Sequence, residues 1–174
     1  RWTASRLAVA WVLNQRGACR PGGRPISDEE RARIGPFFAA SLLDSVRIAE
    51  LGHIRVRNGL QRLLQRAQCC YFERSCFTAI TYVDTVLVNG DWARICGWDT
   101  TLFHECVHVV QYRLLGTRGF LHAYVEGWAS AGCHYAGIPL EQHAHTLHRR
   151  FEADPGAAFS VESEVRRQLG LPSA

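Results

Sequence analysis

Two histidines, His104 and His108, lie four positions apart in a segment whose pattern predicts a helix, and Glu105 directly follows the first of them. Four residues make about one helical turn, so both imidazoles project from the same face and can bind one ion. Neutral imidazoles suit zinc, which lowers the pKa of a water that it binds toward neutrality. A carboxylate beside the first histidine can take a proton from that water as it attacks a carbonyl carbon. The pattern therefore predicts a zinc site at His104 and His108, with Glu105 as the general base.

A catalytic zinc needs a third protein ligand, and two glutamates could supply it. Glu126 lies on the next predicted helix, at a separation from His108 typical of metallopeptidases whose third ligand is a glutamate. Glu141 begins a Glu-x-x-Ala pattern on the helix after that, in which Ala144 would let this helix pack closely on the motif helix. Spacing alone leaves both residues open as the third ligand.

Other polar side chains near the motif have less definite roles. Cys106 lies two residues from each histidine, and a helix turns about 100° per residue, so its thiol should point away from the metal. A hydrogen-bond donor for a transition-state oxyanion could come from a histidine or a tyrosine. The spacing does not choose among the candidates, which are His143, His145, Tyr112, Tyr124 and Tyr135.

The segments that must position these residues are mostly helical. Ser27 and Glu30 form a capping-box pattern, which predicts the start of a short helix that ends before Pro36. Asp99, Thr100 or Thr101 could cap the motif helix, which Gly116 should close. Helices are also predicted at residues 4–16, 37–43, 59–67, 120–135, 139–153 and 161–169. Strands are predicted at 45–49 and 77–88, the latter as one long strand or a bent pair that ends at the turn signal 89–91.

Composition and length indicate one α+β domain over residues 1–174. It divides into an N-terminal helical extension (1–35), a mixed α/β part (36–98) and a helical part that carries the metal site (99–174). All 20 basic residues are arginines, the net charge is +4, and the arginines are spread along the chain. This pattern argues against nucleic-acid binding. The apolar stretch at 7–13 is too short to span a membrane, and we expect an ordinary helix there.

Seven cysteines, an odd number, include no Cys-x-x-Cys pair. Reduced thiols are therefore the expectation, with a bridge from Cys69 or Cys70 to Cys76 as the alternative. This slightly favours a soluble cytoplasmic protein, because secreted domains tend to carry an even, spread set of cysteines.

Residues 37–165 resemble a family of zincin-like metallopeptidases, largely uncharacterised bacterial proteins. The resemblance rests on the Pro-Phe-Phe run at 36–38, the segments 43–48 and 104–112, and the Ile-Pro-Leu-Glu run at 138–141, together with Gly116, Phe120 and Tyr124. It implies an α+β zincin fold, mostly helical with a small β-sheet, and Glu141 as the third zinc ligand. The sequence departs from the family pattern at His143 and His145, where an acidic or polar residue and a tyrosine are usual.

These observations together predict a zinc-dependent hydrolase of peptide or other amide bonds, with a peptide or protein as substrate. The strand within 79–88 would be a sheet edge at which an extended peptide adds by main-chain hydrogen bonds. The alternative is a non-catalytic zinc-binding domain that acts as a structural or interaction module. Glu105 favours the enzyme, because a structural zinc needs no base and usually has four protein ligands.

Overall fold

The computed structural model describes residues 2–50, 79–89 and 97–172. Its helices are α1 (Trp2–Cys19), α2 (Asp28–Ile34), α3 (Ala40–Ser45), α6 (Trp98–Ser130), α7 (Pro139–Ala153) and α8 (Val161–Gln168). Its strands are β1 (Arg47–Glu50), β2 (Ala79–Tyr82) and β3 (Thr85–Val88), and short 3₁₀ turns are η1 (Arg20–Gly22), η2 (Gly35–Phe37) and η4 (Tyr135–Gly137). The mostly helical α+β class with a small sheet is confirmed. The predicted helix at 59–67 and the alternative bridge to Cys76 lie outside the described residues.

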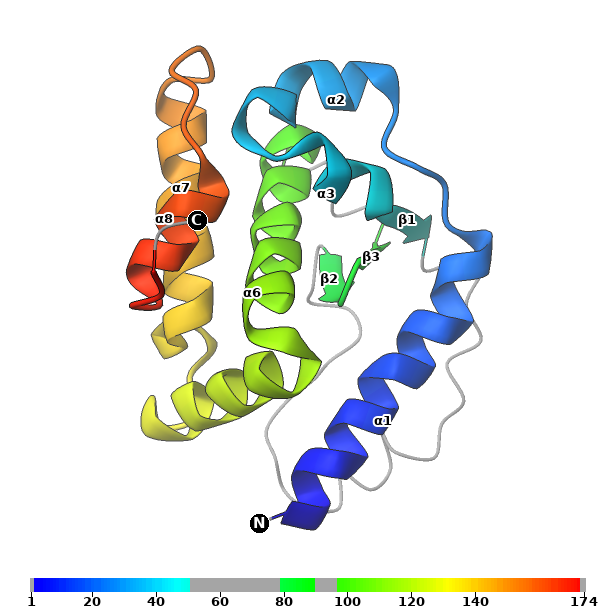
Figure 1. The fold of residues 1–174 in the computed structure, drawn as a ribbon, viewed down its shortest axis with the longest axis vertical. Helices are drawn as coiled ribbons and strands as arrows, with labels where there is room; N and C mark the ends of the chain where they lie inside the picture. The colour runs from blue at the N-terminus through cyan, green and yellow to red at the C-terminus, as the bar shows by residue number, and fades with distance from the viewer. Residues whose placement is uncertain (1, 51–78, 90–96, 173–174) are drawn as a thin grey trace.

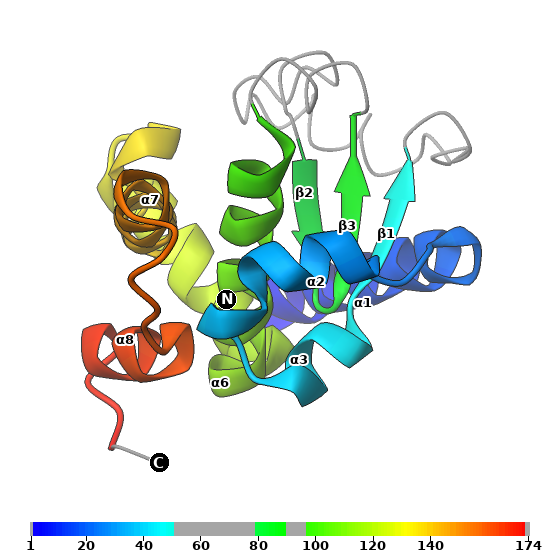
Figure 2. The ribbon, with the colours of Figure 1, turned by 90° about the horizontal axis from the view of Figure 1, so that it is seen from above.

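Helix α6 lies between the sheet on one side and α7 on the other, and α8 packs beside both helices (Figures 1 and 2). The three strands have the order β1-β3-β2, with β1 parallel and β2 antiparallel to β3. Figure 2 shows β2 as the strand next to α6. In the described sheet β2 is an end strand, as predicted for the strand within 79–88, whereas β3 from the same segment is central.

The segment predicted as one long strand or a bent pair forms a hairpin of β2 and β3. The turn between the strands contains Val83 with φ 64°, a conformation that β-branched residues rarely adopt. The next residue, Asp84, accepts hydrogen bonds from Arg16 of α1 at 2.6 and 2.7 Å, and Arg20 lies 3.0 Å from the same carboxylate. These ion pairs fasten the hairpin to the N-terminal helix.

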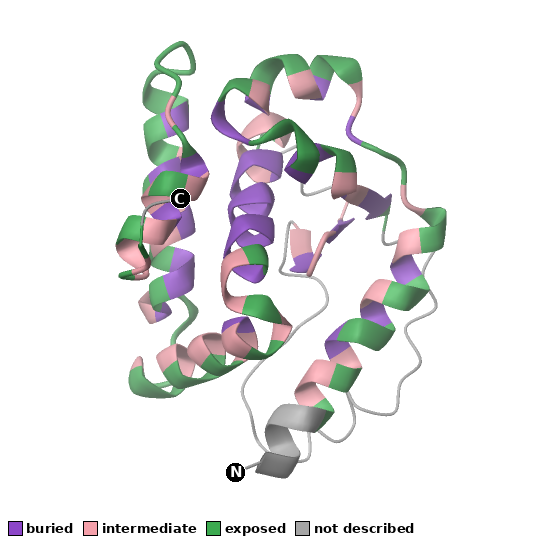
Figure 3. Cartoon of the chain, viewed as in Figure 1, coloured by how far each residue is buried: buried purple, intermediate pink, exposed green. Residues whose placement is uncertain are grey.

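Helix α6 is broken at Gly116, which has φ 67° and ψ 162°. Glycine adopts this conformation without steric cost, so the predicted closure of the motif helix at this residue is confirmed. Every residue from Leu102 to Tyr112 is buried, whereas the part after Gly116 is mostly exposed or half-buried (Figure 3). The predicted cap was wrong: the helix begins earlier, with Gly97 as its N-cap, and the Thr101 hydroxyl donates to the Gly97 carbonyl at 2.9 Å.

A cluster of phenylalanines holds α7 against the first half of α6. Phe103 stacks on Phe151 with ring centroids 4.5 Å apart, and Phe37 meets both rings edge to face. Burial of each such ring stabilises the fold by about 1.5–3 kcal/mol. No helix in the described ranges is long and apolar enough to cross a membrane.

Hydrogen bonds of one buried glutamate connect the start of α6 to α2. Ser27 and Glu30 form the predicted capping box, with hydrogen bonds of 3.2 and 2.7 Å. The Glu30 carboxylate also accepts two hydrogen bonds from Arg24, at 2.8 and 2.6 Å, and one from the indole N–H of Trp98 at 2.6 Å. One carboxylate therefore joins a cap, a loop and the first turn of α6.

Candidate metal centre

Three buried side chains from two helices meet at one point. His104 and His108 come from α6 and Glu141 from the first turn of α7, and their residues are 7, 5 and 3% exposed. The Nε2 atoms of the histidines are 3.1 Å apart, and each lies 3.3 Å from Glu141 Oε2. Bonds of about 2.0–2.1 Å to a tetrahedral zinc would place ligand atoms about 3.3 Å from one another. The three atoms therefore fit one face of such a tetrahedron.

The chain turns back tightly between the two helices at two glycines, Gly127 of α6 and Gly137 of η4. A Cβ on Gly127 would lie 2.6 Å from Cδ of Pro139, and a Cβ on Gly137 would lie 2.5 Å from Cβ of Ala131. The chain between α6 and α7 can turn back this tightly only because both positions lack a side chain. Ala144, fully buried among residues of both helices, performs the close-packing role expected of the Glu-x-x-Ala pattern.

The two glutamates considered as the third ligand have opposite environments. Glu126 is on the exposed second half of α6, with 68% of its side chain accessible and His122 at 3.4 Å. Glu141 is buried against both motif histidines. The structure thus brings Glu141 together with His104 and His108 in a group that could hold a metal ion, and leaves Glu126 at the surface.

His108 is held by Gln111, one helical turn further along α6. Gln111 Nε2 donates to the Leu140 carbonyl at 3.0 Å, which orients the amide so that Oε1 lies 2.8 Å from His108 Nδ1. An amide oxygen only accepts, so Nδ1 must carry a proton. In the neutral form of His108 the lone pair is therefore at Nε2, on the side that faces His104 and Glu141.

Two tyrosines hold the Glu141 carboxylate. Tyr124 donates to Oε1 at 2.9 Å and Tyr135 donates to Oε2 at 2.5 Å. Burial by itself would raise the pKa of Glu141, but the charge of His108 and the hydrogen bonds keep this pKa far below its ordinary value. The carboxylate therefore stays ionised, as a metal ligand must be.

The Glu141 carboxylate affects the pKa values of the two histidines to different degrees. Burial lowers the pKa of His104 to about 4 in spite of the nearby Glu141. Burial opposes protonation of His108 as well, but Glu141 prevails there and raises the pKa to about 9. Without a metal, one proton on His108 balances the Glu141 charge, and a bound cation would take over that function.

Glu105 lies in the same buried region and faces the sheet. Its Oε2 accepts a hydrogen bond of 2.7 Å from the Thr81 hydroxyl of β2. Burial raises the pKa of Glu105 against the opposing effects of His108 and Thr81. A carboxylate with a raised pKa is a stronger base than a solvated one, which suits the predicted general base.

Some of the candidate oxyanion donors lie near the metal-ligand candidates, whereas Tyr112 and Cys106 lie in the core. Tyr124 and Tyr135 contact Glu141, and the ring of His145 lies 4.7 Å from that of His104. Tyr112 is instead buried against Phe120, with ring centroids 3.7 Å apart. Cys106 packs into the core on the far side of the helix, as expected.

Three residues close to the ligands were missed in the sequence: Gln111, Thr81 and His148. Helical spacing could have found two of them, since Gln111 follows His108 by three positions and His148 lies on the same face of α7 as Glu141. His148 Nδ1 is 3.1 Å from His104 Nδ1, so His148 contacts His104 as Gln111 contacts His108. Thr81 had no such signal, because it is far from the motif in sequence.

No protein-family model matches the sequence, and no curated protein or solved structure matches it significantly.

Proposed function

We propose that the chain is a zinc-dependent hydrolase of peptide or other amide bonds. The observation that carries this proposal is the convergence of His104, His108 and Glu141 at tetrahedral ligand distances, with Glu105 buried beside them. Three protein ligands would leave one tetrahedral position open for water, the arrangement of catalytic rather than structural zinc sites. The donor set of two imidazoles and one carboxylate also suits zinc.

In this proposal each side chain has a distinct role. Zinc bound at the three ligands would lower the pKa of a coordinated water toward neutrality. Glu105 takes a proton from the attacking water and passes it to the leaving amine. Thr81 holds Oε2 of Glu105, which fixes the direction of the carboxylate. Gln111, Tyr124 and Tyr135 keep the ligands in place through their hydrogen bonds.

The sheet supports a peptide as the substrate. β2 is an end strand of the described sheet and lies next to α6, and Thr81 of β2 contacts the proposed base. An extended peptide that added to this strand by main-chain hydrogen bonds would run past Glu105. Its carbonyl groups would then come within reach of the metal-binding group.

The test is a screen of the zinc-loaded protein and Glu105→Gln against a diverse peptide library, with zinc content and melting temperature measured for both. The substitution removes the base and retains the size of the side chain, so turnover should fall by about 10²–10⁴-fold. Zinc content should remain that of the wild type, because Glu105 is not one of the three ligands.

Glu126→Gln is the matched control, because it alters an exposed glutamate on the same helix, and it should leave turnover unchanged. Cleavage that survives in Glu105→Gln would contradict the proposed mechanism. Absence of cleavage by a zinc-loaded wild type would favour the non-catalytic zinc-binding module instead.

A further inference from the structure

A second group of histidines meets on the α7 side of the metal centre. The ring centroids of His104 and His145 are 4.7 Å apart, those of His104 and His148 are 5.2 Å apart, and those of His145 and His148 are 5.0 Å apart. One ring nitrogen from each residue lies within 4.8 Å of the other two. The three imidazoles therefore surround a common point that is separate from the one defined by Glu141.

Helix α7 supplies two of these rings in a fixed relation. His145 and His148 are three positions apart, so they project from the same face toward α6. Imidazole in its neutral form is a good ligand for zinc, copper or nickel.

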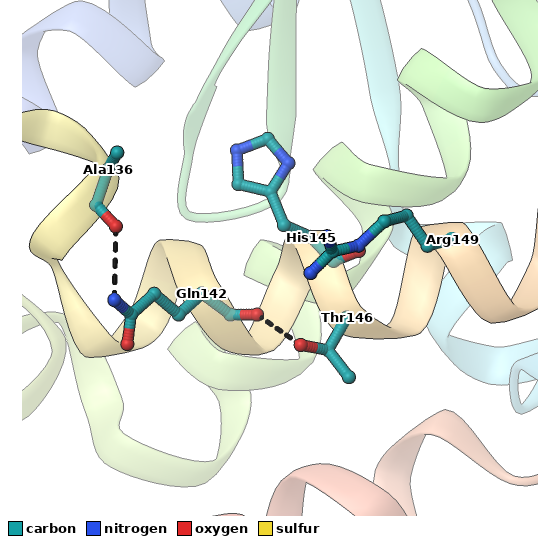
Figure 4. Close-up of a pocket in the computed structure, with 5 residues that line it drawn as sticks. All are labelled: Ala136, Gln142, His145, Thr146 and Arg149. Carbon is teal, nitrogen blue, oxygen red and sulfur yellow. Dashed lines mark hydrogen bonds between the residues drawn. The ribbon is translucent and has the colours of Figure 1, made fainter.

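The second group is also accessible. His145 is half-buried and lines an open pocket of about 480 Å³, together with Ala136, Gln142, Thr146 and Arg149. Figure 4 shows its imidazole rising from α7, while the Gln142 side chain donates to the Ala136 carbonyl and the Thr146 hydroxyl donates to the Gln142 carbonyl. An ion in solution could reach His145 without unfolding the core.

The geometry of the two groups predicts that they differ in affinity. In the first group all three ligand pairs are 3.1–3.3 Å apart, close to the separation in a tetrahedral zinc site. In the second group the Nδ1 atoms of His104 and His148 are 3.1 Å apart, whereas the group as a whole is defined only to within 4.8 Å. No carboxylate belongs to the second group, so it also lacks the negative charge that Glu141 provides.

We propose that His145 and His148, together with His104, form a second and weaker site for a transition-metal ion, and that this ion antagonises the one at the first site. His104 belongs to both groups, and a neutral imidazole has only one lone-pair nitrogen. When Nε2 binds the first ion, Nδ1 carries the proton and donates a hydrogen bond to Nδ1 of His148. An ion bound at His148 removes this acceptor, and by reciprocity each ion weakens the binding of the other.

This inference does not depend on hydrolysis, and metal binding tests it directly. Zinc-binding isotherms of the wild type should show one tight step and one weaker step. His145→Ala should remove the weaker step, and should change the affinity of the tight step by less than about tenfold, the lower limit of an outer-ligand effect. His108→Ala should remove the tight step. This variant therefore tests the first site independently of the second.

The control is His122→Ala, which disrupts the exposed His122–Glu126 pair, a surface location at which zinc could bind adventitiously. Loss of the weaker step in this variant, or its persistence in His145→Ala, would overturn the proposal, as would a wild type with no second step.

The antagonism between the two ions is tested by a separate measurement, the rate of zinc dissociation. Excess Ni²⁺ should accelerate zinc dissociation from the tight site about tenfold or more, the size of an outer-ligand effect, in the wild type but not in His145→Ala.

Discussion

Glu30 and Glu141 are both buried glutamates at the first turn of a helix, yet they lie in clusters of different character. Glu30 accepts from an arginine, an indole N–H and a backbone N–H. Glu141 accepts from two phenols and faces two imidazoles. The first carboxylate therefore has a permanently charged partner, whereas the partners of the second are neutral or change charge with pH.

This difference separates a structural cluster from a candidate functional one. The charge of Glu30 is balanced at every pH at which it is ionised, because arginine does not lose its proton in proteins. The charge of Glu141 is balanced by a proton on His108 until a cation replaces that proton. Removing Glu30 should therefore affect the fold, and removing Glu141 should affect metal binding.

The largest expected effect is that of Glu141→Ala on zinc affinity. Loss of a direct ligand should weaken binding by orders of magnitude, whereas Glu126→Ala should leave the affinity within about tenfold. Competition with a chelator of known affinity measures both variants. The reverse ranking would show that Glu126, on the exposed half of α6, supplies the third ligand and that Glu141 does not.

A smaller effect is expected for Glu30→Gln, this time on the free energy of unfolding. Charged hydrogen bonds of this kind contribute about 1.5–3 kcal/mol, so denaturant unfolding should show a loss of that order. Zinc affinity should not change. A variant with wild-type stability, or one that binds zinc poorly while folded, would remove the distinction between the two clusters.

The decrease in the free energy of unfolding caused by Glu30→Gln should also depend on pH. Burial tends to raise its pKa, but Arg24, Ser27 and Trp98 lower the pKa from 4.5 to about 2. Because the pKa is lower in the folded state, Glu30 stabilises the fold fully above about pH 4.5, and this contribution is lost as the pH falls toward 2. The stability difference between wild type and Glu30→Gln should therefore narrow across this interval.

The smallest effect concerns a residue that touches the metal centre only through another side chain. Gln111→Leu removes the acceptor of His108 Nδ1 and should weaken zinc binding about 10–100-fold. Gln142→Leu is the matched control, since the side chain of this exposed glutamine donates to the Ala136 carbonyl. Equal affinities in the two variants would mean that the orientation of His108 does not depend on Gln111.

The parts of this account that were predictable from sequence are those set by local geometry. The one-turn spacing of His104 and His108 fixes their common face wherever the helix lies. The capping box at Ser27 and the break at Gly116 are equally local. By contrast, the choice between Glu141 and Glu126 depends on how the chain turns between α6 and α7, where Gly137 allows a close approach that no periodicity reveals.

Long-range contacts could not be predicted from the sequence for the same reason. Thr81 reaches Glu105 only because β2 is the strand next to α6, and strand order is not encoded in any local pattern. The parallel pairing of β1 with β3 joins segments far apart in the chain. The first turn of α6 was misjudged because Gly97, rather than a polar side chain, precedes it.

The most direct test of the central claim is zinc analysis combined with X-ray absorption spectroscopy of the purified protein. The geometry of His104, His108 and Glu141 predicts one tightly bound zinc per chain, with nitrogen and oxygen ligands at about 2.0–2.2 Å and no sulfur in the first shell. A sulfur ligand at about 2.3 Å, or a folded wild type that binds no zinc, would contradict the proposed metal centre.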